Sequence, residues 1–171
     1  MKVTDLLDTE YLPYFKPYIN QIGDLLLVDG LEDGLKNTTI FFQSIPSKKL
    51  EYRYAEGKWT IKEILNHLID SERVFVYRAL RFARKDKTTV AGFDENLYAD
   101  ESNANAREIK DLLNEYTLLR QSTIVLYKQF NGEILKRSGI AGSGEVSVRA
   151  LGFLISGHEK HHCEIIKQRY L

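Results

Sequence analysis

Hydrophobic residues recur every three or four positions along four long segments of the chain, and this spacing is typical of amphipathic helices. The segments span about residues 19–43, 60–85, 106–130 and 147–171. In the second segment the apolar stripe consists of Ile61, Ile64, Leu65, Leu68, Phe75, Ala79 and Phe82. Because each stripe must be buried against a partner, the pattern predicts four helices packed as a bundle.

Local signals mark where these helices begin and end. Thr60 and Glu63 have the T-x-x-E spacing of a capping box, and Ser147 is placed to cap the last helix. Pro46 ends the first helix, and the Asn131-Gly132 pair stops the third. Three glycines in the first segment, at positions 23, 30 and 34, weaken it intrinsically by up to about 1 kcal/mol each.

Two connections between the predicted helices carry further information. The segment 86–105 (DKTTVAGFDENLYADESNAN) is long for a compact domain, and its AGFDENLYADE part is predicted to form a pocket wall. The segment 138–145 (SGIAGSGE) is rich in glycine and is predicted to be a loop, and no segment predicts a convincing strand. We therefore predict an all-α fold, a four-helix bundle with a long connection between helices 2 and 3, in a single domain covering residues 1–171.

The composition indicates the protein's partners and compartment but not its reaction. Positive and negative residues balance at 24 each, so no overall field attracts nucleic acid or an anionic membrane. The single cysteine excludes a disulfide framework and fits a reducing compartment. The N-terminus lacks the pattern of a signal peptide, and no stretch approaches the roughly 18 apolar residues of a membrane span. We expect a cytoplasmic protein that binds neither nucleic acid nor membranes.

All four histidines lie in two of the predicted helices, His67 in the second and the others in the last. Residues four apart differ by about 40° around a helix and about 6 Å along it, so His158 and His162 point the same way. They replace aliphatic residues in an apolar seam, where an imidazole without a partner costs roughly 1–3 kcal/mol. His67 lies beside its helix's apolar stripe and can reach a facing helix. The three can hold a divalent metal with one position open, which is typical of catalytic sites; the alternative is core histidines that bind ordinary protein partners.

Neighbouring polar residues are further candidates. His161 points about 60° away from His158 and is predicted to orient a ligand or to pack at the surface. Glu63 and Asp70 share the face of His67, where a carboxylate can orient an imidazole. A capping role for Glu63 and a solvated helix face for Asp70 are equally open.

The segment 158–162 (HEKHH) also matches the H-E-x-x-H pattern of zinc peptidases, in which Glu159 would be the general base. In those enzymes a third ligand usually lies downstream. Only nine residues follow His162, and Glu164 alone among them is a plausible ligand. The pattern is easily met in a charged helix rich in histidine, so the peptidase interpretation is the weaker one.

Three segments together resemble the DinB-like family, namely residues 53–88, 91–98 and 146–171. The resemblance as a whole extends over about residues 10–171. A tryptophan-led helix start, a G-F-D-E loop and an H-x-x-H-H end follow one another in the expected order. The resemblance implies a four-helix bundle that carries zinc or nickel on His67, His158 and His162, often in a dimer. Family members include bacillithiol S-transferases, mycothiol-dependent isomerases and proteins described from their sites as metal-dependent hydrolases.

These observations lead to one functional hypothesis with two alternatives. The hypothesis is a metal-dependent S-transferase of the bacillithiol type, in which the metal holds a low-molecular-weight thiol ready to attack an electrophile. Glu63, Asp70 or His161 would orient ligands or move protons. The alternatives are a hydrolase that uses metal-bound hydroxide and a non-catalytic, stress-related metal-binding domain. The expected partners are a small-molecule thiol, an electrophile and a second copy of the chain.

Overall fold

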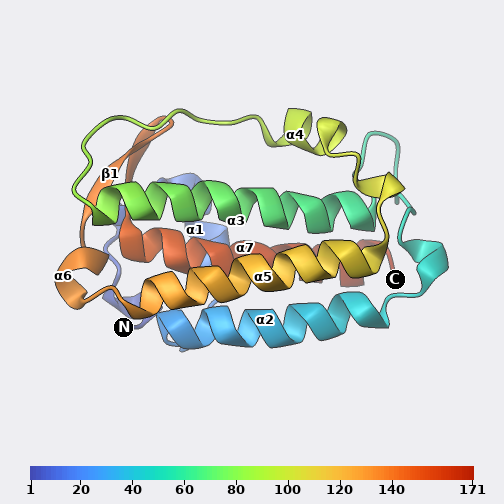
Figure 1. The fold of residues 1–171 in the computed structure, drawn as a ribbon, viewed down its shortest axis with the longest axis horizontal. Coiled ribbons are helices and arrows are strands. Elements are labelled where there is room, and N and C mark those ends of the chain that lie inside the picture. Colours follow the sequence, from blue (N-terminus) through green and yellow to red (C-terminus); the bar gives the residue numbers. More distant parts are fainter.

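The computed structural model of the protein describes residues 1–171, in which four long helices form a bundle (Figure 1). These are α2 (Leu27–Ser44), α3 (Ile61–Ala83), α5 (Ile109–Lys128) and α7 (Val148–Arg169). The short helices are α1 (Lys16–Ile19), α4 (Glu95–Glu101) and α6 (Gly132–Leu135). Strands β1 (Ser138–Ala141) and β2 (Gly144–Ser147) form an antiparallel hairpin between α6 and α7. The predicted four-helix bundle is confirmed, with this hairpin as its one small sheet.

The directions of the four helices require one long crossover. Helices α2 and α7 run one way along the bundle, α3 and α5 run the other way, and the two termini lie at opposite ends (Figure 1). A tight turn cannot join α3 to α5, because they run in the same direction. The connection of residues 84–108, which contains α4, therefore travels back along the length of the bundle (Figure 1). This is the long connection between helices 2 and 3 that the sequence predicts.

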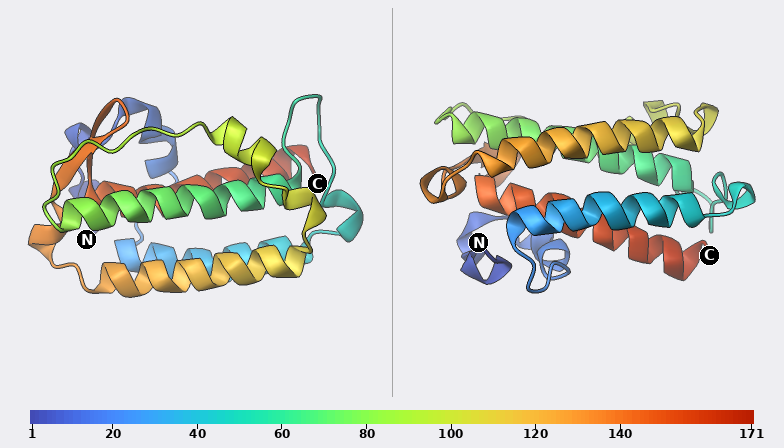
Figure 2. Two further views of the ribbon diagram at one scale, coloured as in Figure 1. Left: turned by 45° about the horizontal axis from the view of Figure 1, so that its top comes forward. Right: turned by 60° about the horizontal axis from the view of Figure 1, so that its bottom comes forward.

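The N-terminal segment adds a cover to one side of the bundle. Helix α7 packs against both α2 and α3, and α1 packs against α7 from outside (Figure 2). An isolated antiparallel β-bridge pairs Lys2 with Leu26, so the two ends of this N-terminal segment lie side by side. Arg149 of α7 forms an ion pair with Glu10 and so fixes the segment to the bundle.

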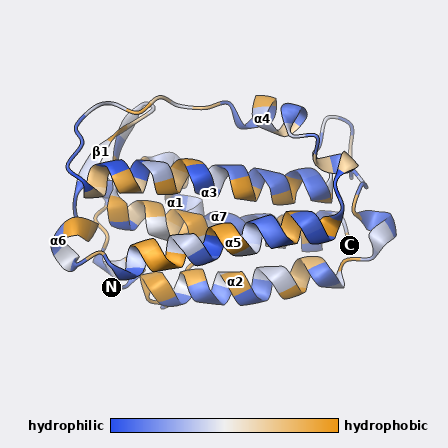
Figure 3. Ribbon diagram, viewed as in Figure 1, coloured by the Kyte–Doolittle hydropathy of each residue, from blue (hydrophilic) through white to orange (hydrophobic).

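Hydrophilic and hydrophobic residues alternate along each of the long helices (Figure 3). The hydrophobic positions supply the buried core of the bundle, as expected for amphipathic helices. No helix combines the length and the apolar character that crossing a lipid bilayer requires.

Two parts of the sequence prediction were wrong, and the first is the start of the first long helix. It was expected at about residue 19, but α2 begins at Leu27. Ile19 and Ile22 are buried, as their apolar character suggests, yet they lie in a short helix and a turn. Gly23 has a φ of 65°, a left-handed conformation that glycine adopts readily, and it turns the chain before α2.

The second difference is the segment 138–145, which was expected to be a loop and instead forms most of the β-hairpin. Ile140 pairs with Glu145 in the hairpin register. The backbone N–H of Val90 donates to Ile140 O, and the N–H of Gly142 donates to Val90 O, both at 2.9 Å. The hairpin is thus bound to the long crossover, and this contact between distant segments supplies hydrogen bonds that the local sequence does not reveal.

The predicted capping signals are present. Thr60 Oγ1 accepts from the backbone N–H of Glu63 at 3.1 Å, and Glu63 Oε2 accepts from the N–H of Thr60 at 2.7 Å. Ser147 Oγ accepts from the N–H of Ala150 at 3.1 Å. These bonds fix the first residues of α3 and α7, which are the two helices that carry the histidines.

A layer of buried charges divides the hydrophobic core into two clusters. Arg120 of α5 is 1% exposed and donates from Nη2 to Glu72 of α3 at 2.9 Å and to Glu159 of α7 at 2.8 Å. The hydroxyl of Tyr116 donates to Glu159 at 2.7 Å, and Leu31 O of α2 accepts from Arg120 Nη1 at 3.3 Å. All four long helices therefore meet at this guanidinium. We call Arg120, Glu72 and Glu159 the charged layer.

A glycine of α2 makes room for this layer. A Cβ at Gly34 would lie 1.7 Å from Glu159 Oε1 and 2.6 Å from Arg120 Nη1. Any side chain there would displace the ion pair. The glycine that weakens the helix intrinsically is therefore explained by packing.

The charged layer should dominate the stability of the fold. We expect Arg120→Ala to lower the free energy of unfolding by about 3–5 kcal/mol, because it leaves two carboxylates buried together without a counter-ion. Urea unfolding followed by circular dichroism measures this loss.

A matched control lies on the same helix. Lys128 pairs with Glu32 at 2.6 Å, but both side chains are about half exposed. Lys128→Ala should therefore cost less than about 1 kcal/mol. Equal effects of the two substitutions would contradict the importance of the buried layer.

Candidate metal centre

The imidazoles of His67, His158 and His162 meet at one point between α3 and α7. His67 Nε2 and His162 Nε2 each lie 3.0 Å from His158 Nε2. The candidate ligand atoms of the three residues all lie within 4.8 Å of one another. His67 and His158 are buried, and His162 is half-buried. The structure thus brings together the three residues that the sequence groups, here called the histidine trio.

Burial keeps the three rings neutral at physiological pH. Burial lowers the pKa of His67 from 6.5 to about 4. The pKa of His158 lies well below its ordinary value because of burial and, secondarily, because His162 and His67 are close. Burial also holds the pKa of His162 well below the ordinary value, with a smaller contribution from His67. Neutral imidazoles are the form that binds metal ions.

The geometry of the trio fits a divalent cation. A neutral imidazole has one N–H and one lone pair, so three converging nitrogens cannot all find partners in each other. One cation among them would accept all three lone pairs. Two nitrogens at about 2.0–2.1 Å from a tetrahedral zinc lie about 3.3 Å apart, which is close to the 3.0 Å found between neighbouring members of the trio. Imidazole ligands suit zinc and nickel alike.

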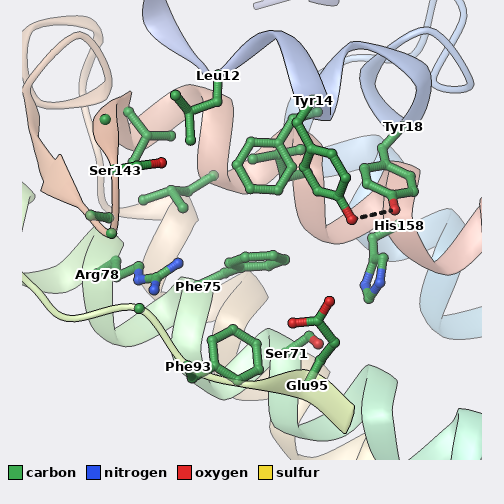
Figure 4. Close-up of a pocket in the computed structure, with 18 of the residues that line it drawn as sticks. Leu12, Tyr14, Tyr18, Ser71, Phe75, Arg78, Phe93, Glu95, Ser143 and His158 are labelled. Carbon is green, nitrogen blue, oxygen red and sulfur yellow. Dashed lines mark hydrogen bonds between the residues drawn. The ribbon is translucent and has the colours of Figure 1, made fainter.

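The trio opens onto a cavity of about 330 Å³, the main cavity (Figure 4). The walls are largely apolar and aromatic, including Leu12, Phe15, Phe75, Phe93, Leu151 and Leu154. Trp59 also lines it, with its ring centroid 4.6 Å from that of His67 and 6.3 Å from that of His162. An apolar cavity with a few polar groups on its wall is typical of a small-molecule site. Trp59 thus both anchors the start of α3 and lines the pocket.

Distant parts of the chain build these walls. Gly92, Phe93 and Glu95 of the long crossover line the cavity, which confirms the predicted role of the AGFDENLYADE segment as a wall. The turn of the β-hairpin supplies another wall, and the N-terminal segment between Leu12 and Tyr18 supplies a third.

Close approach of the N-terminal segment to α7 depends on a glycine. A Cβ at Gly157 would lie 2.2 Å from the carbonyl oxygen of Tyr18. With glycine at this position, the Tyr18 ring packs edge-on against His158, with centroids 5.4 Å apart. The Tyr18 hydroxyl lies 3.4 Å from that of Tyr14, and burial raises the pKa of Tyr18.

The two carboxylates proposed from the sequence bind other parts of the protein. Glu63 is buried, and besides its cap it accepts from Arg53 Nη2 at 2.8 Å and from Asn105 Nδ2 at 2.7 Å. Asp70 accepts from Asn66 Nδ2 at 2.7 Å and pairs with Arg73 at 3.4 Å, and partial burial raises its pKa. Through these contacts Glu63 links the start of α3 to Arg53, in the segment before the helix, and to Asn105, near the end of the long crossover.

His161 lies beside the trio but is turned away from its centre. Its Nδ1 is 3.3 Å from Gln21 Nε2, and its ring lies edge-on to Tyr18 at 5.0 Å between centroids. Partial burial lowers its pKa. Its ring centroid is 5.4 Å from that of His162, so it can support that ligand by packing.

The H-E-x-x-H match does not build a peptidase site. Glu159, which would be the general base, is 1% exposed and pairs with Arg120 in the charged layer. It does not line the main cavity. Since Glu159 is one residue from His158, its side chain points about 100° away from the imidazole and into the core.

Tyr18, Arg78 and Glu95 are polar residues that line the cavity and were not predicted as site residues from the sequence. Glu95 belongs to the segment that was predicted to form a pocket wall, but the sequence did not single it out as a site residue. Arg78 follows His67 by 11 residues, which places the two about 20° apart around α3. That spacing was the available signal for Arg78, and nothing local marked Tyr18.

Comparisons with known proteins connect this site to a family. A sequence model of the DinB superfamily matches residues 31–166. A protein of Oceanobacillus iheyensis named "putative metal-dependent hydrolase" is 26% identical over 160 residues, covering 92% of this chain and 82% of that protein. A protein of Bacillus cereus with the same name is 21% identical over 149 residues, covering 87% of this chain and 86% of that protein.

The fold is also similar to a solved structure. YfiT from Bacillus subtilis, described as a probable metal-dependent hydrolase with an unusual four-helix bundle topology, superposes with a TM-score of 0.76. The match covers 83% of this chain and 82% of that one, at 17% sequence identity. At this identity the likeness supports the fold and not the reaction.

Metal binding should depend on the trio and not on His161. We expect His67→Ala, His158→Ala and His162→Ala each to lower zinc affinity by more than about 100-fold, since each removes one ligand of three. His161→Ala, the matched control on the same helix, should lower it less than about tenfold. Competition with a chromophoric chelator measures the affinities. Equal losses in all four variants would rule out this ligand set.

The metal-free protein should lose stability as the pH falls from about 6.5 towards about 4. The folded pKa of His67 is depressed to about 4, so the unfolded chain takes up a proton at a higher pH than the folded chain, and protonation favours unfolding. The shift corresponds to roughly 3 kcal/mol, present above pH 6.5 and lost on acidification. Urea unfolding at several pH values in the presence of a chelator measures it. In His67→Gln the pH dependence should be shallower, and an unchanged slope would contradict the burial of a neutral His67.

Proposed function

Because this chain belongs to the DinB superfamily, we propose that it is a metal-dependent enzyme whose divalent cation, zinc or nickel, binds His67, His158 and His162. The observation that carries the proposal is the convergence of three neutral imidazoles on the wall of a largely apolar cavity. A structural metal site would have four protein ligands and would be closed, whereas three ligands facing a cavity leave room for a small molecule. The names of the relatives agree with metal-dependent catalysis.

The chain contributes the environment in which such an ion acts. When bound, a divalent ion lowers the pKa of a water or thiol ligand and so supplies a nucleophile near neutral pH. All three proposed ligands are neutral, so the ion keeps its full double charge. Trp59, Phe75 and Phe93 give the site an apolar aromatic lining, and an apolar surrounding strengthens electrostatic interactions.

Two cavities meet at one member of the trio, His162, which favours a reaction between two molecules. A second cavity of about 290 Å³ shares Trp59 and His162 with the main cavity. Its wall includes Lys58, Asn96 and His161, so it is more polar than the main cavity. We propose that a hydrophilic low-molecular-weight thiol approaches from this side and an apolar electrophile from the main cavity. In this reaction the thiol gives up its proton, its sulfur forms a bond to the electrophilic carbon, and the bond from that carbon to the leaving group breaks.

Hydrolysis is the second candidate, and the names of the relatives favour it. In this case water takes the place of the thiol, and an ester or amide occupies the main cavity. The histidine trio serves both reactions equally, so the nucleophile is what distinguishes them.

Glu95 is suited to move the proton of the nucleophile in either reaction. It is the one carboxylate that lines the main cavity, and its side chain points into it (Figure 4). It is the first residue of α4, which is capped by Asp94 Oδ1 through the N–H groups of Asn96 and Leu97 at 3.0 and 3.1 Å. The cap fixes the backbone from which Glu95 reaches the cavity.

The two reactions can be compared on one zinc- or nickel-loaded sample. We expect conjugation of 1-chloro-2,4-dinitrobenzene with bacillithiol or a related thiol, followed by absorbance, to exceed cleavage of p-nitrophenyl esters. Both rates should disappear in His158→Ala. Faster ester cleavage would contradict the transferase proposal and support hydrolysis. Metal binding without either activity, across a panel of thiols and esters, would leave a non-catalytic metal-binding domain.

Glu95→Gln should separate catalysis from metal binding. We expect the substitution to lower kcat by about 100-fold, as is typical for loss of a group that moves a proton, and to leave zinc affinity unchanged. Glu101→Gln, at the other end of α4 and exposed, is the matched control and should leave kcat unchanged. A loss of zinc affinity in Glu95→Gln would instead assign Glu95 to the metal ligands.

A further inference from the structure

One arginine faces the main cavity without a counter-ion. Arg78 is 7% exposed and lines the cavity together with the histidine trio. Its one hydrogen bond to the protein runs from Nη2 to Ala91 O at 3.0 Å, and its Nε is buried without a partner. The guanidinium also lies over the ring of Phe93, 5.8 Å from the centroid. Most of its five N–H donors are therefore unused.

The other buried arginines of this protein are paired. Arg120 binds two carboxylates in the charged layer, and Arg149 binds Glu10. Burial lowers the pKa of Arg78, whereas Glu10 raises that of Arg149. A buried charge without a partner is unfavourable, and such groups are usually paired or hydrogen-bonded. The exception in this chain is the arginine that reaches a ligand-sized cavity.

The position of Arg78 relates it directly to the metal centre. His67, Ser71, Phe75 and Arg78 follow one another at spacings of four, four and three residues along one face of α3, and all line the cavity. The Cα atoms of His67 and Arg78 are therefore about 16 Å apart along the helix. The Arg78 guanidinium points into the cavity at the end where Ser143 of the hairpin turn lies, and His158 lies at the other end (Figure 4).

We propose that Arg78 binds the oxyanion, a carboxylate or a phosphate, of a small molecule whose apolar body fills the main cavity. Arginine presents N–H groups in a fork that matches either oxyanion. Phe75 and Phe93 line the part of the cavity between Arg78 and the histidine trio, where an apolar body fits. Glu95 repels an anion from its own part of the cavity, so the charged end points to Arg78. The opposite end of the ligand would then react at the histidine trio, and this part of the inference rests on the proposed function.

Three probes with one body and different ends test the proposal: 4-phenylbutyrate, 4-phenylbutyl phosphate and 4-phenylbutanol. Binding is measured by calorimetry and by the fluorescence of Trp59, the single tryptophan, which lines the cavity. The protein is metal-free, since a carboxylate could otherwise bind the ion. At least one anionic probe should bind more than about tenfold tighter than the alcohol. The tighter of the two anions identifies the oxyanion.

Substitutions then assign the preference to Arg78. Arg78→Met should lower the affinity for the preferred anion by about tenfold or more and change that for the alcohol by less than about twofold. Arg84→Met, with the same change of charge at an exposed site just beyond α3, should change neither affinity. An arginine that only holds the crossover through Ala91 and Phe93 would lower both affinities equally in Arg78→Met, which would overturn the proposal.

The wild-type measurement alone can still overturn the proposal if Arg78→Met fails to fold. Equal binding of the three probes, or no binding of either anion at millimolar concentration, would overturn the anion site. Because these measurements use metal-free protein and no turnover, they are independent of the reaction. An enzyme inactive in every thiol and ester assay could still show the anion preference, and an active one could lack it.

Discussion

Arg120 is the point at which the four long helices are held in register. Its guanidinium binds Glu72 of α3 and Glu159 of α7, and it also donates to a carbonyl oxygen of α2. A charge taken out of water needs partners with defined directions, whereas hydrophobic packing tolerates small rotations. Glu159 must therefore point into the core. His158, the next residue on the helix, must then point about 100° away, where the main cavity lies. The geometry of the histidine trio thus depends on a charge network that does not touch the cavity.

Much of the fold was predictable because its main signals are local. Helical periodicity and the Thr60 cap placed α3 and α7 within two residues of their observed bounds. The i, i+4 spacing of His158 and His162 was enough to group them. The predicted start of the first long helix was too early, because an apolar residue such as Ile22 is buried in a turn as readily as in a helix. The hairpin was missed because its strands are short and its stability depends on pairing with Val90, which is distant in the sequence.

The polar half of the site was less predictable for a physical reason. A glutamate or arginine on a helix is usually solvated, and the sequence does not say which of them will be buried. Glu72 and Arg120 are buried because they meet across helices, which only the three-dimensional arrangement reveals. Arg78 and Glu95 line one cavity because the long crossover returns over α3 (Figures 1 and 4). Local patterns can therefore predict a metal centre more readily than the pocket that selects its ligand.

The separation of the trio along the chain has a mechanical consequence. His67 and His158 are 91 residues apart, on two helices that no short loop joins. A cation shared between them would act as a reversible cross-link that closes a large loop of the polypeptide, and the entropy lost on closing a loop rises with the logarithm of its length. Binding of the ion would then further stabilise the packing of α3 against α7, in addition to the charged layer.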